Sequence, residues 1–113
     1  MKSHEDVRPW GKFEQFTHNQ PCTVKILEIH PHQRLSLQSH HYREEWWIAL
    51  DDGVIAEVNG LRQILQRGEQ LFVPKQSKHR ITAGERAVRV LEIAFGHFDE
   101  QDITRYEDDF GRI

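Results

Sequence analysis

The sequence has little of what would mark a secreted, membrane-bound or nucleic-acid-binding protein. Cys22 is the single cysteine, so no disulfide can form within the chain. The first six residues, MKSHED, lack the apolar stretch that a signal peptide or a membrane span requires. Acidic side chains (18) outnumber basic ones (15), and no basic run exceeds two residues, which argues against a nucleic-acid partner. These absences predict a cytoplasmic protein without membrane contact.

Helix-forming periodicity is also scarce, and short apolar or β-branched runs separated by turn residues predict an all-β protein. The chain of 113 residues is long enough for one hydrophobic core and too short for two, so we expect one domain over residues 1–113. The Asn59-Gly60 step predicts a tight hairpin. Only the C-terminal tail, 99–109, is expected to carry a helical turn, capping one end of the barrel. Strands are predicted over 12–16, 22–30, 34–39, 45–50, 54–58, 62–66, 70–73, 79–82 and 88–95.

Four polar side chains form the most informative pattern. Gln38 and His40 lie two apart, so in a strand they share one face while Leu35 and Leu37 point to the other. Glu45 follows a short turn, and we expect a returning antiparallel strand to bring its carboxylate opposite them. His79 starts another predicted strand. Two imidazoles, a carboxylate and an amide oxygen predict a divalent-metal site with open coordination positions.

Eight or nine short strands with metal ligands on two separated hairpins fit a cupin fold, the double-stranded β-helix or jelly roll. Several motifs then occur in the order of one family. The chain resembles the C-terminal cupin domain of type II phosphomannose isomerases, the bifunctional mannose-6-phosphate isomerase and mannose-1-phosphate guanylyltransferase enzymes. The resemblance spans almost the whole chain, and it is carried by Arg8-Pro-Trp-Gly11, Leu35-Ser-Leu-Gln38 with His40, Arg43 and Glu45, Pro74 with His79-Arg80, and Asp102-Ile103 with Arg105, Asp108 and Gly111-Arg112.

The resemblance implies that Gln38, His40, Glu45 and His79 hold a divalent ion, whether Zn, Mn, Co or Fe. It further implies a metal-dependent isomerase that converts mannose 6-phosphate to fructose 6-phosphate through a cis-enediolate. The nucleotidyltransferase half is absent from the 113 residues, so guanylyl transfer is not implied. Two other interpretations stay open: a non-catalytic cupin that binds a sugar or nucleotide sugar, and another cupin enzyme such as an epimerase or dioxygenase.

The family places an arginine at position 43, which makes Arg43 the first choice for a catalytic or phosphate-binding cation. The alternative is a surface ion pair between Arg43 and Glu44. Lys78 is a second candidate for a catalytic residue, and Arg80 and His41 are predicted to bind substrate. The alternative for Lys78 and Arg80 is that they alternate with His79 along the strand and simply face solvent. The general base is left open among Glu45, His41, Lys78 and a metal-bound water.

The sequence departs from the family pattern at four positions. Trp46 replaces a histidine, His32 and Gln76 replace glycines, and Ala83 replaces an asparagine. Strand alternation predicts that Trp47 shares the face of Glu45 and that Trp46 points away, so the change at 46 removes no ligand. An exposed aromatic surface around Trp46 predicts a homodimer. The expected small-molecule partner is a sugar phosphate.

Overall fold

The computed structural model describes residues 3–113, and within them it contains strands and connecting turns but no helix. Nothing in this range therefore forms a helix long and apolar enough to cross a membrane. The strands are β1 (His4–Arg8), β2 (Gly11–Gln15), β3 (Cys22–Ile29), β4 (Leu37–Ser39), β5 (Arg43–Ala49), β6 (Val54–Val58), β7 (Leu61–Leu65), β8 (Gln70–Val73), β9 (His79–Thr82), β10 (Val88–Gly96) and β11 (Thr104–Glu107).

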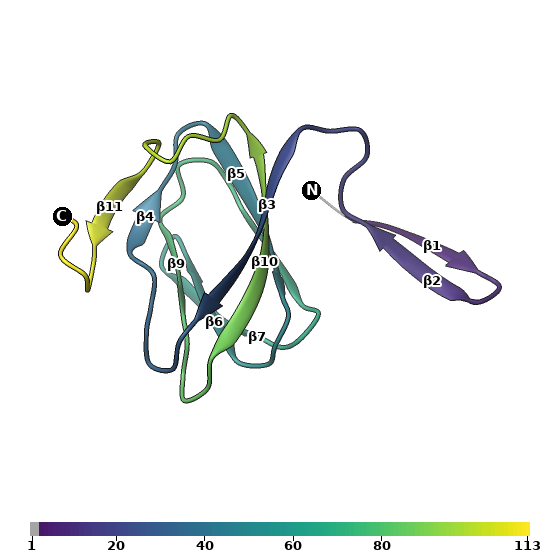
Figure 1. Cartoon of the computed structure of the whole chain (residues 1–113), viewed down its shortest axis with the longest axis horizontal. Helices are drawn as coiled ribbons and strands as arrows, with labels where there is room; N and C mark the ends of the chain where they lie inside the picture. The colour runs from purple at the N-terminus through teal and green to yellow at the C-terminus, as the bar shows by residue number, and fades with distance from the viewer. Residues whose placement is uncertain (1–2) are drawn as a thin grey trace.

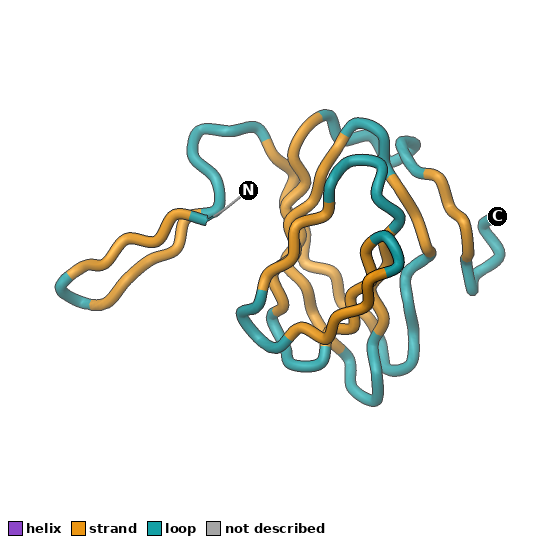
Figure 2. Tube along the Cα trace, turned by 180° about the vertical axis from the view of Figure 1, so that it is seen from behind, coloured by secondary structure: helices purple, strands orange, loops and turns teal. Residues whose placement is uncertain are grey.

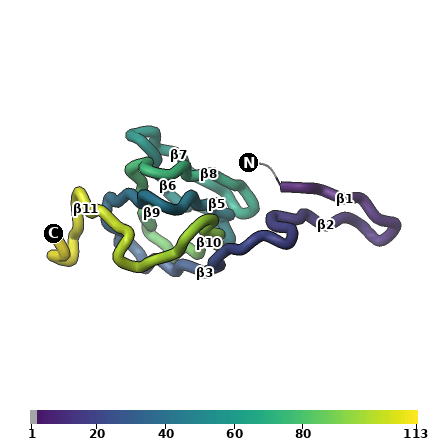
Figure 3. The backbone as a smooth tube through the Cα atoms, turned by 90° about the horizontal axis from the view of Figure 1, so that it is seen from above, coloured from purple at the N-terminus to yellow at the C-terminus, as the bar shows by residue number. Residues whose placement is uncertain are grey.

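Two antiparallel sheets form the body of the protein, as Figure 1 and Figure 3 show. One sheet has the strand order β3-β10-β5-β8 and the other β11-β4-β9-β6-β7. The main core fills the space between them and includes Trp47, Val54, Ile81 and Val90, each 1% exposed or less. The predicted all-β cupin architecture is therefore confirmed.

Strand alternation gives β5 and β10 an inner and an outer face. In β5, Trp47 joins the main core, whereas Trp46 and Ile48 belong to a second apolar cluster. Phe16, in the segment that leads into β3, lies edge-on to Trp46 with 5.2 Å between ring centroids. The prediction that Trp47 shares the face of Glu45 and Trp46 points away is confirmed. Because Phe16 and its neighbours leave Trp46 only 3% exposed, Trp46 offers no aromatic surface for a dimer contact.

The β6–β7 hairpin is connected by the two residues that were expected to form a tight turn. Asn59 and Gly60 both have positive φ, 50° and 82°, and Val58 pairs directly with Leu61. Two consecutive residues with positive φ define the type I′ turn, whose twist matches that of the flanking strands. The hairpin prediction is confirmed.

Two regions differ from expectation at the ends of the chain. The tail forms strand β11, which pairs with β4 at the edge of its sheet, so the predicted helical turn is wrong. Near the other end, β1 and β2 form a hairpin that extends away from the body, as Figure 1 and Figure 2 show. Within it, Arg8 donates a hydrogen bond to Asp6 at 3.0 Å and lies over the Phe13 ring.

Both family glycine positions that carry larger side chains adopt a left-handed backbone. His32 has φ 62° and Gln76 has φ 64°. Glycine reaches this region without steric cost, whereas a residue with a Cβ is strained there. Both turns therefore have the backbone geometry that glycine adopts most readily.

Candidate metal centre

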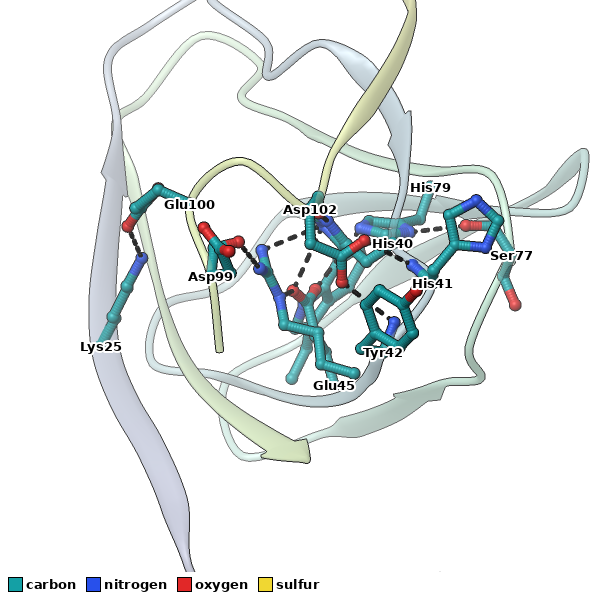
Figure 4. A network of polar contacts seen from close by, with 12 residues as sticks. Lys25, His40, His41, Tyr42, Glu45, Ser77, His79, Asp99, Glu100 and Asp102 are labelled. Carbon is teal, nitrogen blue, oxygen red and sulfur yellow. Dashed lines mark hydrogen bonds and ion pairs between the residues drawn. The ribbon is translucent and has the colours of Figure 1, made fainter. Parts of the chain in front are cut away.

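Three buried side chains converge at one end of the space between the sheets (Figure 4). Ligand atoms of His40, Glu45 and His79 all lie within 4.8 Å of one another. The Glu45 carboxylate lies between the rings: Oε2 is 3.6 Å from His40 Nε2, and Oε1 is 3.4 Å from His79 Nε2. Each of the three residues is 3% exposed or less.

The two sheets supply these residues from opposite sides. His79 begins β9 and His40 directly follows β4, which are neighbouring strands of one sheet, whereas Glu45 lies in β5 of the other sheet. Glu45 therefore reaches the histidines across the sandwich. The strand after the turn thus brings the Glu45 carboxylate opposite His40, but from the facing sheet, because the short turn at 40–42 carries the chain from one sheet to the other.

Backbone carbonyls fix the orientation of both imidazole rings. His40 Nδ1 lies 2.6 Å from the Asp102 carbonyl oxygen, and His79 Nδ1 lies 2.8 Å from that of Ser77. Because a carbonyl oxygen only accepts, each Nδ1 carries the proton and donates it. Each Nε2 is therefore unprotonated and close to Glu45, which is the tautomer that a metal-binding histidine needs.

Burial also keeps both rings neutral. Desolvation lowers the pKa of His40 and of His79 below the ordinary value of 6.5, and it outweighs the opposing effect of the Glu45 carboxylate. His79 Nε2 is a buried atom with no hydrogen-bond partner. A buried lone pair without a partner is costly, and a metal ion would satisfy it. Two neutral imidazoles and a carboxylate therefore fit a divalent cation.

Arg43 occupies part of the same space. Its Nε donates to Glu45 Oε2 at 3.2 Å, and its Nη2 donates to His40 Nε2 at 3.2 Å. Arg43 is only 8% exposed, and it pairs with Glu45 rather than with Glu44 at the surface. Gly96 is opposite Arg43 in the strand pairing, and any Cβ there would overlap the Tyr42 carbonyl oxygen, so glycine lets β10 approach this turn.

Gln38 pairs with His79 in the register of β4 and β9, which places it beside the three donors. Gln38, His40 and Glu45 line a cavity of about 180 Å³, together with Leu27, Leu35, Lys25, Arg43, Glu92, Glu100, Ile103 and Arg105. Leu35 thus lines the same cavity as Gln38. The expectation that it faces away is wrong, because β4 begins only at Leu37 and strict alternation does not extend back to 35.

The structure adds a carboxyl group that sequence reasoning missed. Glu92 lies in β10 between inward-facing Val90 and Ala94, and it is 7% exposed. Burial raises the pKa of Glu92 to about 7, and the neighbouring Glu45 carboxylate raises it as well. The sequence feature that could have identified Glu92 is a single carboxylate at an inward-facing position of an otherwise apolar strand.

Asp102 holds the turn that carries His40. Its two carboxylate oxygens accept hydrogen bonds from the amides of His41 and Tyr42, each at 2.9 Å, while its carbonyl accepts from the His40 ring (Figure 4). Desolvation raises the pKa of Asp102, but the two amide bonds and the nearby cations lower it overall. The amide of Gln76 donates to the His40 carbonyl at 2.8 Å, so the turn is also tied to the loop before His79.

Three other predicted residues are not among those that line the cavity. Lys78 is exposed and lies over the Tyr106 ring, with 4.3 Å from its Nζ to the ring centroid. Arg80 alternates with His79 and points to the outer face of the sheet, where its Nη1 donates to Glu107 at 2.8 Å. The His41 side chain is exposed. The catalytic and substrate-binding roles proposed for these residues stay predictions.

A family model and several curated proteins match this chain. A family model described as "Mannose-6-phosphate isomerase C-terminal" matches residues 1–108. Similar curated proteins include the mannose-1-phosphate guanylyltransferase ManC of Salmonella typhimurium (30% identity, 97% of this chain, 24% of ManC) and the alginate biosynthesis protein AlgA of Pseudomonas aeruginosa (32%, 96% and 23%). The xanthan biosynthesis protein XanB of Xanthomonas campestris is 33% identical over 93% of this chain. The chain spans about a quarter of the length of these relatives.

Solved structures show the same fold at low sequence identity. A cupin protein from Bacteroides fragilis superposes with a TM-score of 0.61 at 20% identity, covering 72% of this chain and 74% of that one. A Cupin 2 conserved barrel domain protein from Salinispora arenicola gives 0.61 at 19% identity, covering 88% and 76%. These likenesses support the fold alone.

The relatives correct the functional prediction. They are named for guanylyl transfer to mannose 1-phosphate and for alginate and xanthan biosynthesis, and each is about four times as long as this chain. The prediction of a metal-dependent isomerase that converts mannose 6-phosphate to fructose 6-phosphate is therefore wrong. The resemblance to the isomerase-like cupin domain of bifunctional enzymes is confirmed.

Proposed function

Because the chain belongs to the mannose-6-phosphate isomerase C-terminal family, we propose that it is a divalent-metal-binding enzyme domain that takes a mannose-type sugar in nucleotide-sugar synthesis. The sugar class comes from the relatives, whose printed names include mannose-1-phosphate guanylyltransferase. Guanylyl transfer to mannose 1-phosphate makes a nucleotide sugar. Because this chain covers only 24% of these relatives, the proposal takes from them the sugar class and not the transfer reaction.

One observation carries the metal assignment. His79 Nε2 is buried without a hydrogen-bond partner, and it lies within 4.8 Å of ligand atoms of Glu45 and His40. A purely structural polar network would satisfy this atom, because unpaired buried polar groups cost about 1–3 kcal/mol. The arrangement is therefore better explained as a binding site than as core packing.

Each residue has a distinct task in this proposal. His40 and His79 would hold the ion through Nε2 and Glu45 through its carboxylate. Trp47 Nε1 donates to Glu45 Oε1 at 3.2 Å and keeps the carboxylate oriented. Gln38 offers an amide oxygen beside His79. When bound, the ion supplies positive charge that polarises a sugar oxygen. Arg43 would have to release its hydrogen bonds to Glu45 and His40 for these atoms to hold an ion.

The test is direct metal binding. Protein stripped with a chelator is titrated calorimetrically with Mn²⁺, Co²⁺ or Zn²⁺, beside a His79→Gln variant and a His30→Ala control whose histidine is exposed and does not line the cavity of the site. We expect one ion per chain and unchanged binding in the control. In His79→Gln we expect a loss greater than the roughly 10- to 100-fold that removal of an outer-shell partner causes.

Equal affinity in wild type and His79→Gln would contradict the proposed site. Failure of all three ions to bind would leave Arg43 as the resident cation of the site, and the proposal would be withdrawn. The sugar assignment is tested on the metal-loaded protein by saturation-transfer NMR with mannose and mannose 1-phosphate. It is rejected if neither ligand binds.

A further inference from the structure

The outer face of the four-stranded sheet is apolar from edge to edge but covered on one side only. Val24 of the edge strand β3 is opposite Ile93 of β10, which is opposite Trp46 of β5. Ile93 and Trp46 are buried, whereas Val24 is 56% exposed. Ile26, on the same face of β3, is 61% exposed. Val24 and Ile26 thus form an exposed apolar strip along a sheet edge, the β3 strip, of the kind that proteins usually cover.

The β1–β2 hairpin of the same chain is anchored over the other side of this face. Phe16, just after the hairpin, lies edge-on to Trp46 of β5, and Gln70 of β8 donates a hydrogen bond to Glu14 of β2 at 2.8 Å. In the sheet order β3-β10-β5-β8, these contacts lie away from β3. From this root the hairpin extends outward from the body (Figure 1 and Figure 2). The hairpin therefore leaves the β3 strip of its own chain uncovered.

The hairpin also lacks a sheet of its own to pack on. Within residues 3–113, β1 and β2 form a separate two-stranded sheet, and a hairpin of this kind is at best marginally stable in water. Val7 and Trp10, at and near its tip, are the most exposed of its apolar side chains. The Cα radius of gyration is 14.7 Å, above the roughly 13 Å of a compact domain of this length. Docking on a second surface would stabilise this protruding hairpin.

We propose that two copies of the chain exchange their hairpins, so that the tip of each hairpin covers the β3 strip of the other copy. The uncovered strip and the unsupported hairpin are on the same chain, so a single twofold axis supplies both with a partner and creates two identical contacts. Trp10 is the expected anchor of each contact, because a large aromatic side chain gains most from burial at an interface. The inference concerns assembly and does not depend on the proposed function.

Charge supports the same pairing. Arg8 and Lys12 flank Trp10 and give the tip a positive charge, although each also pairs with an acidic residue of the hairpin at the surface. Glu28 is exposed and continues the face of Ile26 along β3, so the strip ends at a negative charge. Opposite charges at the two surfaces favour docking of the tip near Glu28.

The experiment measures molar mass by light scattering and the dimer dissociation constant by sedimentation, on the full chain. Trp10→Ser alters the hairpin tip, and Ile26→Glu places a charge in the β3 strip. The control is Leu61→Glu, which places the same charge at an exposed apolar position of β7 in the other sheet. Circular dichroism melting verifies that each variant is folded.

We expect wild type and Leu61→Glu to form dimers at micromolar concentration. Trp10→Ser and Ile26→Glu should each raise the dimer dissociation constant by at least about 10-fold. Mixing these two variants should restore dimers in part, because the mixed pair keeps one intact hairpin tip on one intact strip. A symmetric contact between two strips would leave no intact contact in the mixture, so recovery on mixing is specific to exchange.

Three results would overturn the proposal. A monomeric wild type would leave the β3 strip to a different occupant. A dimer that folded Trp10→Ser or Ile26→Glu protein forms as tightly as wild type would place the interface elsewhere. Loss of the dimer in both variants without any recovery on mixing would replace hairpin exchange by a symmetric packing of like surfaces.

Discussion

The Glu45 carboxylate connects the two sheets electrostatically. It accepts hydrogen bonds from Trp47 Nε1 and from Arg43 Nε, and its oxygens face the Nε2 atoms of His40 and His79. Without an ion, Arg43 is the cation that makes burial of this charge tolerable. Removing one member of a buried ion pair is strongly destabilising, because the remaining charge is uncompensated. In the proposed metal site, an ion would therefore compete with Arg43 for the same donor atoms.

Replacing Arg43 by methionine tests this competition. We expect Arg43→Met to lose about 3–5 kcal/mol of stability in the metal-free protein, because Glu45 is left unpaired. An added divalent ion should stabilise the variant more than it stabilises wild type, since no guanidinium has to be displaced. Thermal melting with and without Mn²⁺ measures both effects. A smaller metal-induced shift in the variant than in wild type would contradict the competition.

Glycine at position 76 should stabilise the protein. Gln76 has φ 64°, in the left-handed region where a Cβ is strained. We expect Gln76→Gly to gain about 0.5–1 kcal/mol, because relief of strain exceeds the added entropy of the unfolded chain. Chemical denaturation measures this gain. The control is Gln66→Gly, at an exposed position with φ outside the left-handed range, and it should not stabilise the protein. A lower stability of Gln76→Gly than of wild type would contradict the strain argument.

The sequence identified the three convergent donors but not all of their neighbours. His40, Glu45 and His79 were recognisable because their motifs resemble a known family. Glu92 was missed because it lies in an apolar strand without a motif of its own. Arg105 was recognised in a motif, yet its place in the cavity depends on the pairing of β11 with β4, which local sequence does not encode.

At the scale of elements, the segment after β10 positions the turn between β4 and β5. Asp102 accepts from two consecutive amides of that turn, and its carbonyl orients the His40 ring. The sequence predicted most strands within a few residues, because alternation of apolar residues is a local signal. It missed β1 and assigned a helical turn to the region of β11, because both strands are short and mostly exposed.

Loss of the Asp102 carboxylate should weaken metal binding without removing a ligand. We expect Asp102→Ala to lower metal affinity by about 10- to 100-fold, because the His40 turn loses two hydrogen bonds that hold it. Asp52→Ala is the matched control, since Asp52 accepts one amide bond from Arg67 in a turn of other strands. Calorimetric titration distinguishes them, and equal affinities in the two variants would contradict a positioning role for Asp102.

At the scale of the whole molecule, Glu92 makes stability depend on pH. Its pKa is about 7 in the folded protein against an ordinary 4.5. Between these values the folded state binds more protons than the unfolded chain, so the contribution of Glu92 to stability falls as pH rises from 4.5 to 7. His40 and His79 act in the opposite direction, because their lowered pKa values reduce stability as pH falls below 6.5.

Glu92→Gln isolates the first effect. We expect the variant to be more stable than wild type by on the order of 1–3 kcal/mol above pH 7, with the difference shrinking toward pH 4.5. Urea denaturation at a series of pH values measures the difference, and the histidine contribution cancels between the two proteins. A difference that is constant with pH would contradict the assignment.

The homodimer stays a prediction, and its original basis in Trp46 no longer applies because that ring is buried. The exposed apolar side chains of the β1–β2 hairpin are now the better argument: Val7 is 77% exposed and Trp10 is 73% exposed. Light scattering at micromolar concentration should give twice the chain mass for wild type and a smaller mass for Trp10→Ser. A purely monomeric wild type would reject the dimer.

The most direct test of this account is the stoichiometry of metal binding at the convergent donors. Chelator-treated protein is dialysed against Mn²⁺, Co²⁺ or Zn²⁺ and analysed by elemental mass spectrometry, beside the His79→Gln variant. The account predicts one ion per chain in wild type, for at least one metal, and a negligible amount in the variant. No bound ion in wild type, or equal amounts in both proteins, would contradict it.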